Sequence, residues 1–77
     1  MVHIHTDFGV FSVEHTTGQT VAQMIQSLFD QQDMESRGGW QVQETMTGSV
    51  LDVNSETVDT RYYYLTGFIV RRAHRTP

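Results

Sequence analysis

The chain of 77 residues has no cysteine, no lysine and a single proline. Without cysteine it can form neither a disulfide framework nor a thiolate metal site. A domain this short buries only about 60 to 65% of its unfolded surface, so its core is marginally stable without a staple or a partner. We therefore expect a homo-oligomer, a dimer or larger.

Long apolar runs are also missing, which excludes a helix that spans a bilayer. The first residues, Met1-Val2-His3-Ile4-His5, lack the basic start and the apolar stretch of a secretory signal. Charged residues make up 18% of the chain, and its apolar content does not indicate general disorder. These features predict a cytoplasmic domain with no membrane partner.

Positive charge is scarce and confined mainly to one end. Residues 1–60 contain all nine acids and one base, Arg37, whereas residues 61–77 contain four arginines and no acid. The resulting charges of -8 and +4 sum to the formal net charge of -4, and the isoelectric point is about 5.3. This balance disfavours a nucleic-acid partner, because phosphate binding normally needs a basic surface.

Residues 2–15 follow the two-residue period of a strand, and the apolar parity changes near Gly9. Two structures explain this slip: one long strand with a bulge, or a hairpin whose turn is Asp7-Phe8-Gly9. We favour the single bulged strand with its break near residue 9.

Residues 18–36 are predicted to form an amphipathic helix, with Thr17 or Thr20 as its N-cap. Gly38 and Gly39 are expected to end it, since glycine accepts the left-handed conformation that closes helices. The apolar positions follow helical spacing: Val21, Met24, Ile25, Leu28 and Phe29.

Two further strands are predicted, at residues 40–47 and 61–72. The acidic segment 48–60 between them is interpreted as a loop or hairpin tip, and residues 73–77 as a basic tail. Residues 61–72 have few polar positions on either face, which is typical of the middle of a sheet. We predict one α+β domain, a βαββ unit with a three-stranded sheet, a central C-terminal strand and the helix on one face. A second copy would cover the other face, which carries two of the three tyrosines.

Two motifs, Gly38-Gly39-Trp40-Gln41-Val42 and Phe68-Ile69-Val70-Arg71-Arg72, resemble a family of very small bacterial and phage proteins of unknown function. The resemblance covers most of residues 20–73. It implies a βαββ fold in which a Gly-Trp pair opens the second strand, and it implies no activity. The chain departs from this family in the acidic segment 48–60 and in its interrupted first strand.

His3, His5 and Asp7 share one face of an uninterrupted strand, with about 6.6 Å between successive positions. Such spacing suits ligands of zinc or a similar ion, with His15 or His74 as a distant fourth. The alternative is a polar face in solvent. No nucleophile or leaving-group stabiliser accompanies the histidines at a recognisable spacing, so we predict no enzyme and no cofactor.

Three more groups are candidate contact residues. Tyr62 and Tyr64, next to Arg61, have the character of strand aromatics that stack bases, or that fill the core and a dimer interface. A basic group near the end of the chain has the chemistry to hold a phosphate or an acidic partner, or to pair with acids at the helix end. An acidic group in the segment 48–60 either forms a negative surface for a basic protein or belongs to a solvated loop. The basic group is Arg71, Arg72 and Arg75, and the acidic group is Asp52, Glu56 and Asp59.

Together these features favour a non-enzymatic interaction module, a homo-oligomer that binds another protein or a small ligand. One version is a phage or mobile-element inhibitor whose acidic surface blocks a basic, nucleic-acid-binding host complex. The alternatives are a metal-binding protein that uses His3, His5 and Asp7, and a single-stranded nucleic-acid binder that uses the tyrosines.

Overall fold

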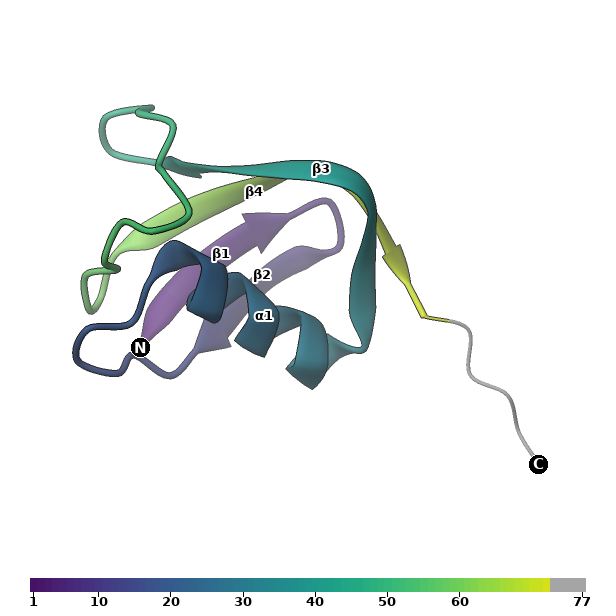
Figure 1. Cartoon of the computed structure of the whole chain (residues 1–77), viewed down its shortest axis with the longest axis horizontal. Coiled ribbons are helices and arrows are strands. Elements are labelled where there is room, and N and C mark those ends of the chain that lie inside the picture. Colours follow the sequence, from purple (N-terminus) through teal and green to yellow (C-terminus); the bar gives the residue numbers. More distant parts are fainter. Residues whose placement is uncertain (73–77) are drawn as a thin grey trace.

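The computed structural model describes residues 1–72, which form a four-stranded mixed sheet with one helix (Figure 1). The strand order is β2-β1-β4-β3, in which β1 and β4 are parallel and the other neighbours are antiparallel. The predicted α+β class is confirmed, but the sheet has four strands rather than three. In chain order the elements are β1 (Val2–Thr6), β2 (Gly9–Val13), α1 (Val21–Gln32), β3 (Met34–Glu44) and β4 (Tyr62–Arg71).

Strands β1 and β2 form a hairpin, so the prediction of a single bulged strand over residues 2–15 is wrong. Gly9 has a φ of 125°, and Thr6 closes the turn by accepting from the Phe8 amide and donating to the Gly9 carbonyl. Val2 pairs with Val13, and Ile4 pairs with Phe11. This pairing explains the slip in parity, because it brings Val2, Ile4, Phe11 and Val13 onto one face of the sheet.

Helix α1 is shorter than the predicted range of 18–36. Thr20 is the N-cap, and its hydroxyl accepts from the Gln23 amide while the Gln23 side chain accepts from the Thr20 amide. The helix ends at Asp33, which takes the left-handed conformation expected of Gly38 or Gly39. The earlier end has a packing reason, because the next residue, Met34, is fully buried as part of β3.

Strand β3 begins six residues before the predicted position 40 and bends sharply along its length (Figure 1). The glycines Gly38 and Gly39 lie at an irregularity, where Ser36 pairs with Ile69 and Trp40 pairs with Gly67. Four steps on β3 therefore face two steps on β4, which bends the ribbon around the end of the helix. Within the described part of the chain, no helix is long and apolar enough to cross a membrane.

The connection between β3 and β4, residues 45–61, binds the start of the helix. The Ser55 carbonyl accepts from the Val21 amide at 2.8 Å, and the Val53 carbonyl accepts from the Ala22 amide at 3.0 Å. These two amides belong to the first helical turn, which has no partners inside the helix. The acidic segment 48–60 is thus part of the loop that joins the antiparallel strands β3 and β4, and it also forms a strap over the helix N-terminus.

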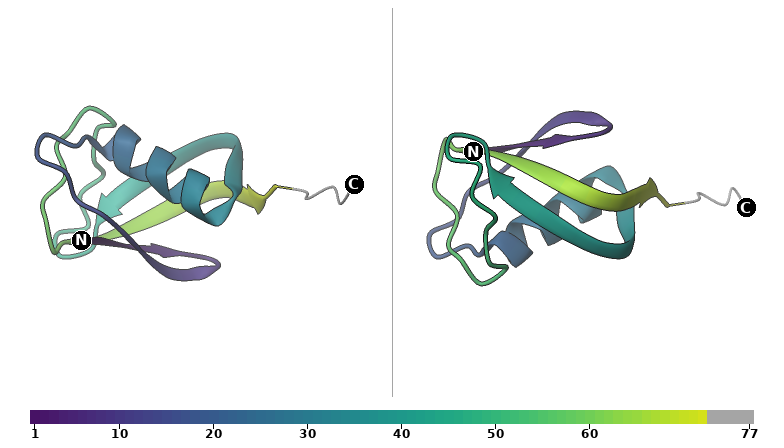
Figure 2. Two further views of the ribbon diagram at one scale, coloured as in Figure 1. Left: turned by 90° about the horizontal axis from the view of Figure 1, so that it is seen from below. Right: turned by 90° about the horizontal axis from the view of Figure 1, so that it is seen from above.

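Helix α1 covers one face of the sheet, as the two views of Figure 2 show. The core between the helix and this face includes Ile4, Leu28 and Tyr63, each at most 1% exposed. Strand β4 lies between β1 and β3, so it contributes Tyr63 and Leu65 to the middle of the core. The opposite face has no covering element among residues 1–72.

Candidate functional site: the open face of the sheet

The face opposite α1 forms one continuous surface across all four strands. Its central row follows the strand pairing from Val50 through Gln43, Tyr64 and His5 to Val10, and each of these residues is a direct neighbour of the next. Two shorter rows flank it. We call the part of this surface on residues 2–13, 41–50 and 62–66 the open face; past the bend of β3 the same side of the sheet continues with Glu35 and Val70, which are not included. The residues of the open face are His3, His5, Val10, Ser12, Gln41, Gln43, Val50, Tyr62, Tyr64 and Thr66.

No residue of the open face is Asp, Glu, Lys or Arg, although these types make up 18% of the chain. Aromatic rings occupy its centre on the two inner strands. The ring of Tyr62 lies 4.7 Å from that of His3 and 5.8 Å from that of His5, centroid to centroid. Tyr62 and Tyr64 remain 47% and 39% exposed. An exposed surface with many rings and no charge has the composition of the centre of a protein interface.

His3 is held in place by its neighbour on β2. Its Nδ1 lies 2.9 Å from the hydroxyl oxygen of Ser12, the residue paired with it across the hairpin. Against its other side lies the Tyr62 ring. The imidazole is therefore fixed by a hydrogen bond and a ring contact, although it is on the surface.

The predicted ligand set of His3, His5 and Asp7 does not form within one chain. Both histidines lie on the open face, but Asp7 lies in the β1–β2 turn and leaves the strand. His15 lies beyond the end of β2 and contacts the Thr57 carbonyl through its Nε2, while His74 lies outside the described residues. Among residues 1–72, no group of three or more histidine or acidic side chains is arranged to hold a metal ion.

Arginines of the C-terminal part of the chain form contacts within the fold. Arg61 forms a 2.6 Å ion pair with Glu44, and Arg72 lies 3.6 Å from Asp33, the acid that caps the helix. Arg71 donates to the Gln32 carbonyl at the helix end, and its guanidinium lies 5.3 Å from the centre of the Phe8 ring. Arg71, the last residue of β4, and Arg72, the residue after it, thus meet the end of α1, which is the alternative to a phosphate site. Arg75 lies outside the described residues.

The acidic residues of the connection are exposed and shape its backbone. Asp52 accepts from the Asn54 amide, and Asp59 accepts from the Thr60 amide and from the Met1 ammonium group. The ammonium group lowers the pKa of Asp59 below its usual value, chiefly through this hydrogen bond. Glu56 pairs with Thr20 at the start of the helix. These carboxylates are spread along the strap and do not converge on one point.

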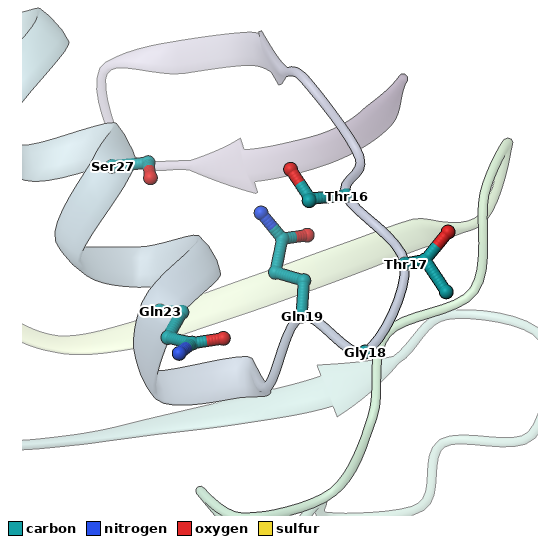
Figure 3. Close-up of a pocket in the computed structure, with 6 residues that line it drawn as sticks. All are labelled: Thr16, Thr17, Gly18, Gln19, Gln23 and Ser27. Atoms are coloured by element: carbon teal, nitrogen blue, oxygen red, sulfur yellow. The ribbon is translucent and has the colours of Figure 1, made fainter.

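A pocket of about 390 Å³ lies between the helix and the segment before it (Figure 3). Its amides already have structural partners: Gln19 donates to the Glu14 carbonyl and accepts from the Thr57 hydroxyl, and Gln23 caps the helix. Its remaining polar side chains are hydroxyls, and no lining residue is charged. The lining residues are Thr16, Thr17, Gly18, Gln19, Gln23 and Ser27. The pocket therefore offers little to fix a ligand, and the open face is the stronger candidate.

Sequence reasoning identified the open-face rings but missed its polar members Ser12, Gln41 and Gln43 and its edge residue Val50. Alternation along β3 was a usable signal for the two glutamines, whereas the bridge from Val50 to Gln43 follows only from the folded connection. Comparison with protein-family models, with curated proteins and with solved structures gives no match for this chain.

Proposed function

We propose that the protein is a non-enzymatic interaction module that works as a homodimer, with the open faces of two copies packed against each other. The observation that carries this proposal is the complete lack of formal charge on the open face of an acidic chain. Two copies with a charge of -4 each repel at long range, and this face is a surface where they meet without like charges in contact.

The size of the open face sets the strength of such a dimer. Strands lie about 4.8 Å apart and same-face positions about 6.6 Å apart, so the face with its side chains measures roughly 24 Å by 20 Å. Two copies would then bury about 1,000 Å² in total, which is below the roughly 1,200 to 2,000 Å² of stable complexes. We therefore expect a weak dimer, with a dissociation constant in the micromolar range or higher.

Face-to-face packing buries Val50 of the connection between β3 and β4 and leaves residues 52–59 of that connection accessible on both copies. Its exposed acids, Asp52, Glu56 and Asp59, then supply a second surface for a basic protein, including a host nucleic-acid-binding complex. Such binding is electrostatic, so we expect it to weaken as the salt concentration rises.

Sedimentation equilibrium of the wild type and two charge variants tests the proposal. Tyr64→Glu adds a charge at the centre of the open face, and Met46→Glu adds the same charge at a position 80% exposed, outside this face. We expect concentration-dependent dimers for the wild type and Met46→Glu, and a monomer for Tyr64→Glu. Circular dichroism checks that each variant is folded, and His5→Glu replaces Tyr64→Glu if the latter unfolds.

A wild type that stays monomeric at millimolar concentration would overturn the homodimer. A labelled single-stranded oligonucleotide completes the experiment, because rings on the inner strands of an open sheet also stack bases. If the oligonucleotide binds the wild type and not Tyr64→Glu while no dimer forms, the open face is a nucleic-acid platform and the proposal is wrong.

A further inference from the structure

His3 and His5 form a pair of imidazoles suited to chelation. They are separated by one residue on β1, so their side chains leave the same face about 6.6 Å apart. The Tyr62 ring packs against both of them. Imidazole is a preferred ligand of zinc, copper and nickel, and a chain without cysteine has no thiolate that competes with it.

The contact between His3 and Ser12 prepares one of these ligands. In the tautomer that carries its proton on Nδ1, this nitrogen donates to the Ser12 hydroxyl at 2.9 Å, and Nε2 carries the free lone pair. Histidines that bind metals are commonly oriented by a hydrogen bond from the second ring nitrogen. Ser12 therefore holds the direction of the ring and leaves Nε2 as the nitrogen available to a metal ion.

Among residues 1–72, one chain supplies two ligands here, because Asp7 lies in the turn. A tetrahedral zinc site needs four. A two-fold axis that lies between paired open faces and crosses β1 midway between His3 and His5 would bring these side chains of two copies together and complete the set. The ligands are neutral, and the acidic chains attract a cation to the interface.

We propose that His3 and His5 of two copies bind one divalent ion of the zinc class between the open faces. This inference rests on the proposed homodimer, and it adds to it the staple that the small interface lacks. The histidines of the second copy take the places of the third and fourth ligands that were expected within one chain. Ser12 is a positioning residue for the site.

Zinc chloride, added to protein purified without a histidine tag, tests the site by calorimetry and sedimentation equilibrium. We expect one zinc ion per two chains and at least a tenfold decrease in the dimer dissociation constant, reversed by a chelator. His5→Ala should lose both effects. His15→Ala removes a histidine that lies away from the open face, and it should keep them.

Ser12→Ala separates positioning from structure. It should weaken zinc binding by roughly tenfold, while the dissociation constant of the metal-free dimer should equal that of the wild type. One zinc ion per monomer, or zinc binding that His5→Ala retains, would overturn the bridging site. If the dimer forms equally well with and without zinc, the bridging zinc site is wrong and the homodimer stands. If the protein is a monomer under both conditions, the zinc site and the homodimer are both wrong.

Discussion

The two faces of the sheet are built from the same strands and have opposite chemistry. Three consecutive tyrosines in β4 illustrate the difference: Tyr63 points into the core and is 1% exposed, whereas Tyr62 and Tyr64 lie on the open face and are 47% and 39% exposed. On the covered face, volume and hydrogen bonding determine which residue fits. On the open face the shared property is the absence of charge, so substitutions there should affect association more than stability.

Leu28→Ala should give the largest loss of stability, because Leu28 is fully buried between α1 and the covered face. Truncation of a buried leucine leaves a cavity and costs about 3 to 4 kcal/mol. For a chain of this size we expect the melting temperature to fall by at least about 12 °C in thermal unfolding. Phe68→Ala is the matched control, because it removes a larger ring that is 68% exposed. Equal losses for the two variants would mean that burial against the covered face does not decide which side chains stabilise the fold.

Gly67→Ala should destabilise the fold by about 2 to 3 kcal/mol. A Cβ at this position would lie 2.7 Å from the Gly39 carbonyl oxygen and 2.9 Å from the Trp40 Cα, and the φ of 145° is unfavourable for alanine. Gly38→Ala is the control in the same irregularity, since no atom lies within 4 Å of its added Cβ. Chemical denaturation should show a lower midpoint only for Gly67→Ala. A neutral result would mean that β3 and β4 separate easily at the bend.

Local signals explain which elements could be predicted. The helix has a clear apolar period and the reciprocal cap of Thr20 and Gln23, and β4 is a continuous apolar run, so both were found from sequence. The slip at Gly9 had two local solutions, and the pairing of Val2 with Val13 decides between them. Gly38 and Gly39 are stronger helix terminators than Asp33, but burial of Met34 ends the helix earlier.

The candidate site was predictable only in part, because its composition depends on register. Alternation placed His3 and His5 on one face, and the same alternation wrongly included Asp7, which the turn removes from the strand. The contact between His3 and Ser12 requires the hairpin, and the row from Gln43 to Tyr64 requires the pairing of β3 with β4. Such long-range pairs leave no periodic trace in a single sequence.

Tyr63→Phe tests the polar part of the covered face with the smallest possible change. The Tyr63 hydroxyl accepts a hydrogen bond from the Val58 amide at 2.9 Å, so its removal leaves that amide without its partner. We expect a loss of about 1 to 2 kcal/mol in the free energy of unfolding. Tyr64→Phe should change stability by less than about 0.5 kcal/mol, since Tyr64 lies on the open face. If the two variants are equally stable, the hydrogen bond between Tyr63 and Val58 contributes nothing to stability.

Thr20→Ala should have the smallest of these effects, about 1 kcal/mol, because it removes one half of a helix cap. The Gln23 amide loses the Thr20 hydroxyl, but the Val21 and Ala22 amides keep the carbonyls of Ser55 and Val53. The strap should therefore limit the damage, and the helix content measured by circular dichroism should stay unchanged. Thr17→Ala, at an exposed position before the helix, is the control and should be neutral. A loss of about 3 kcal/mol for Thr20→Ala would mean that the cap holds the strap as well as the helix, since the start of α1 and residues 53–56 would then unfold together.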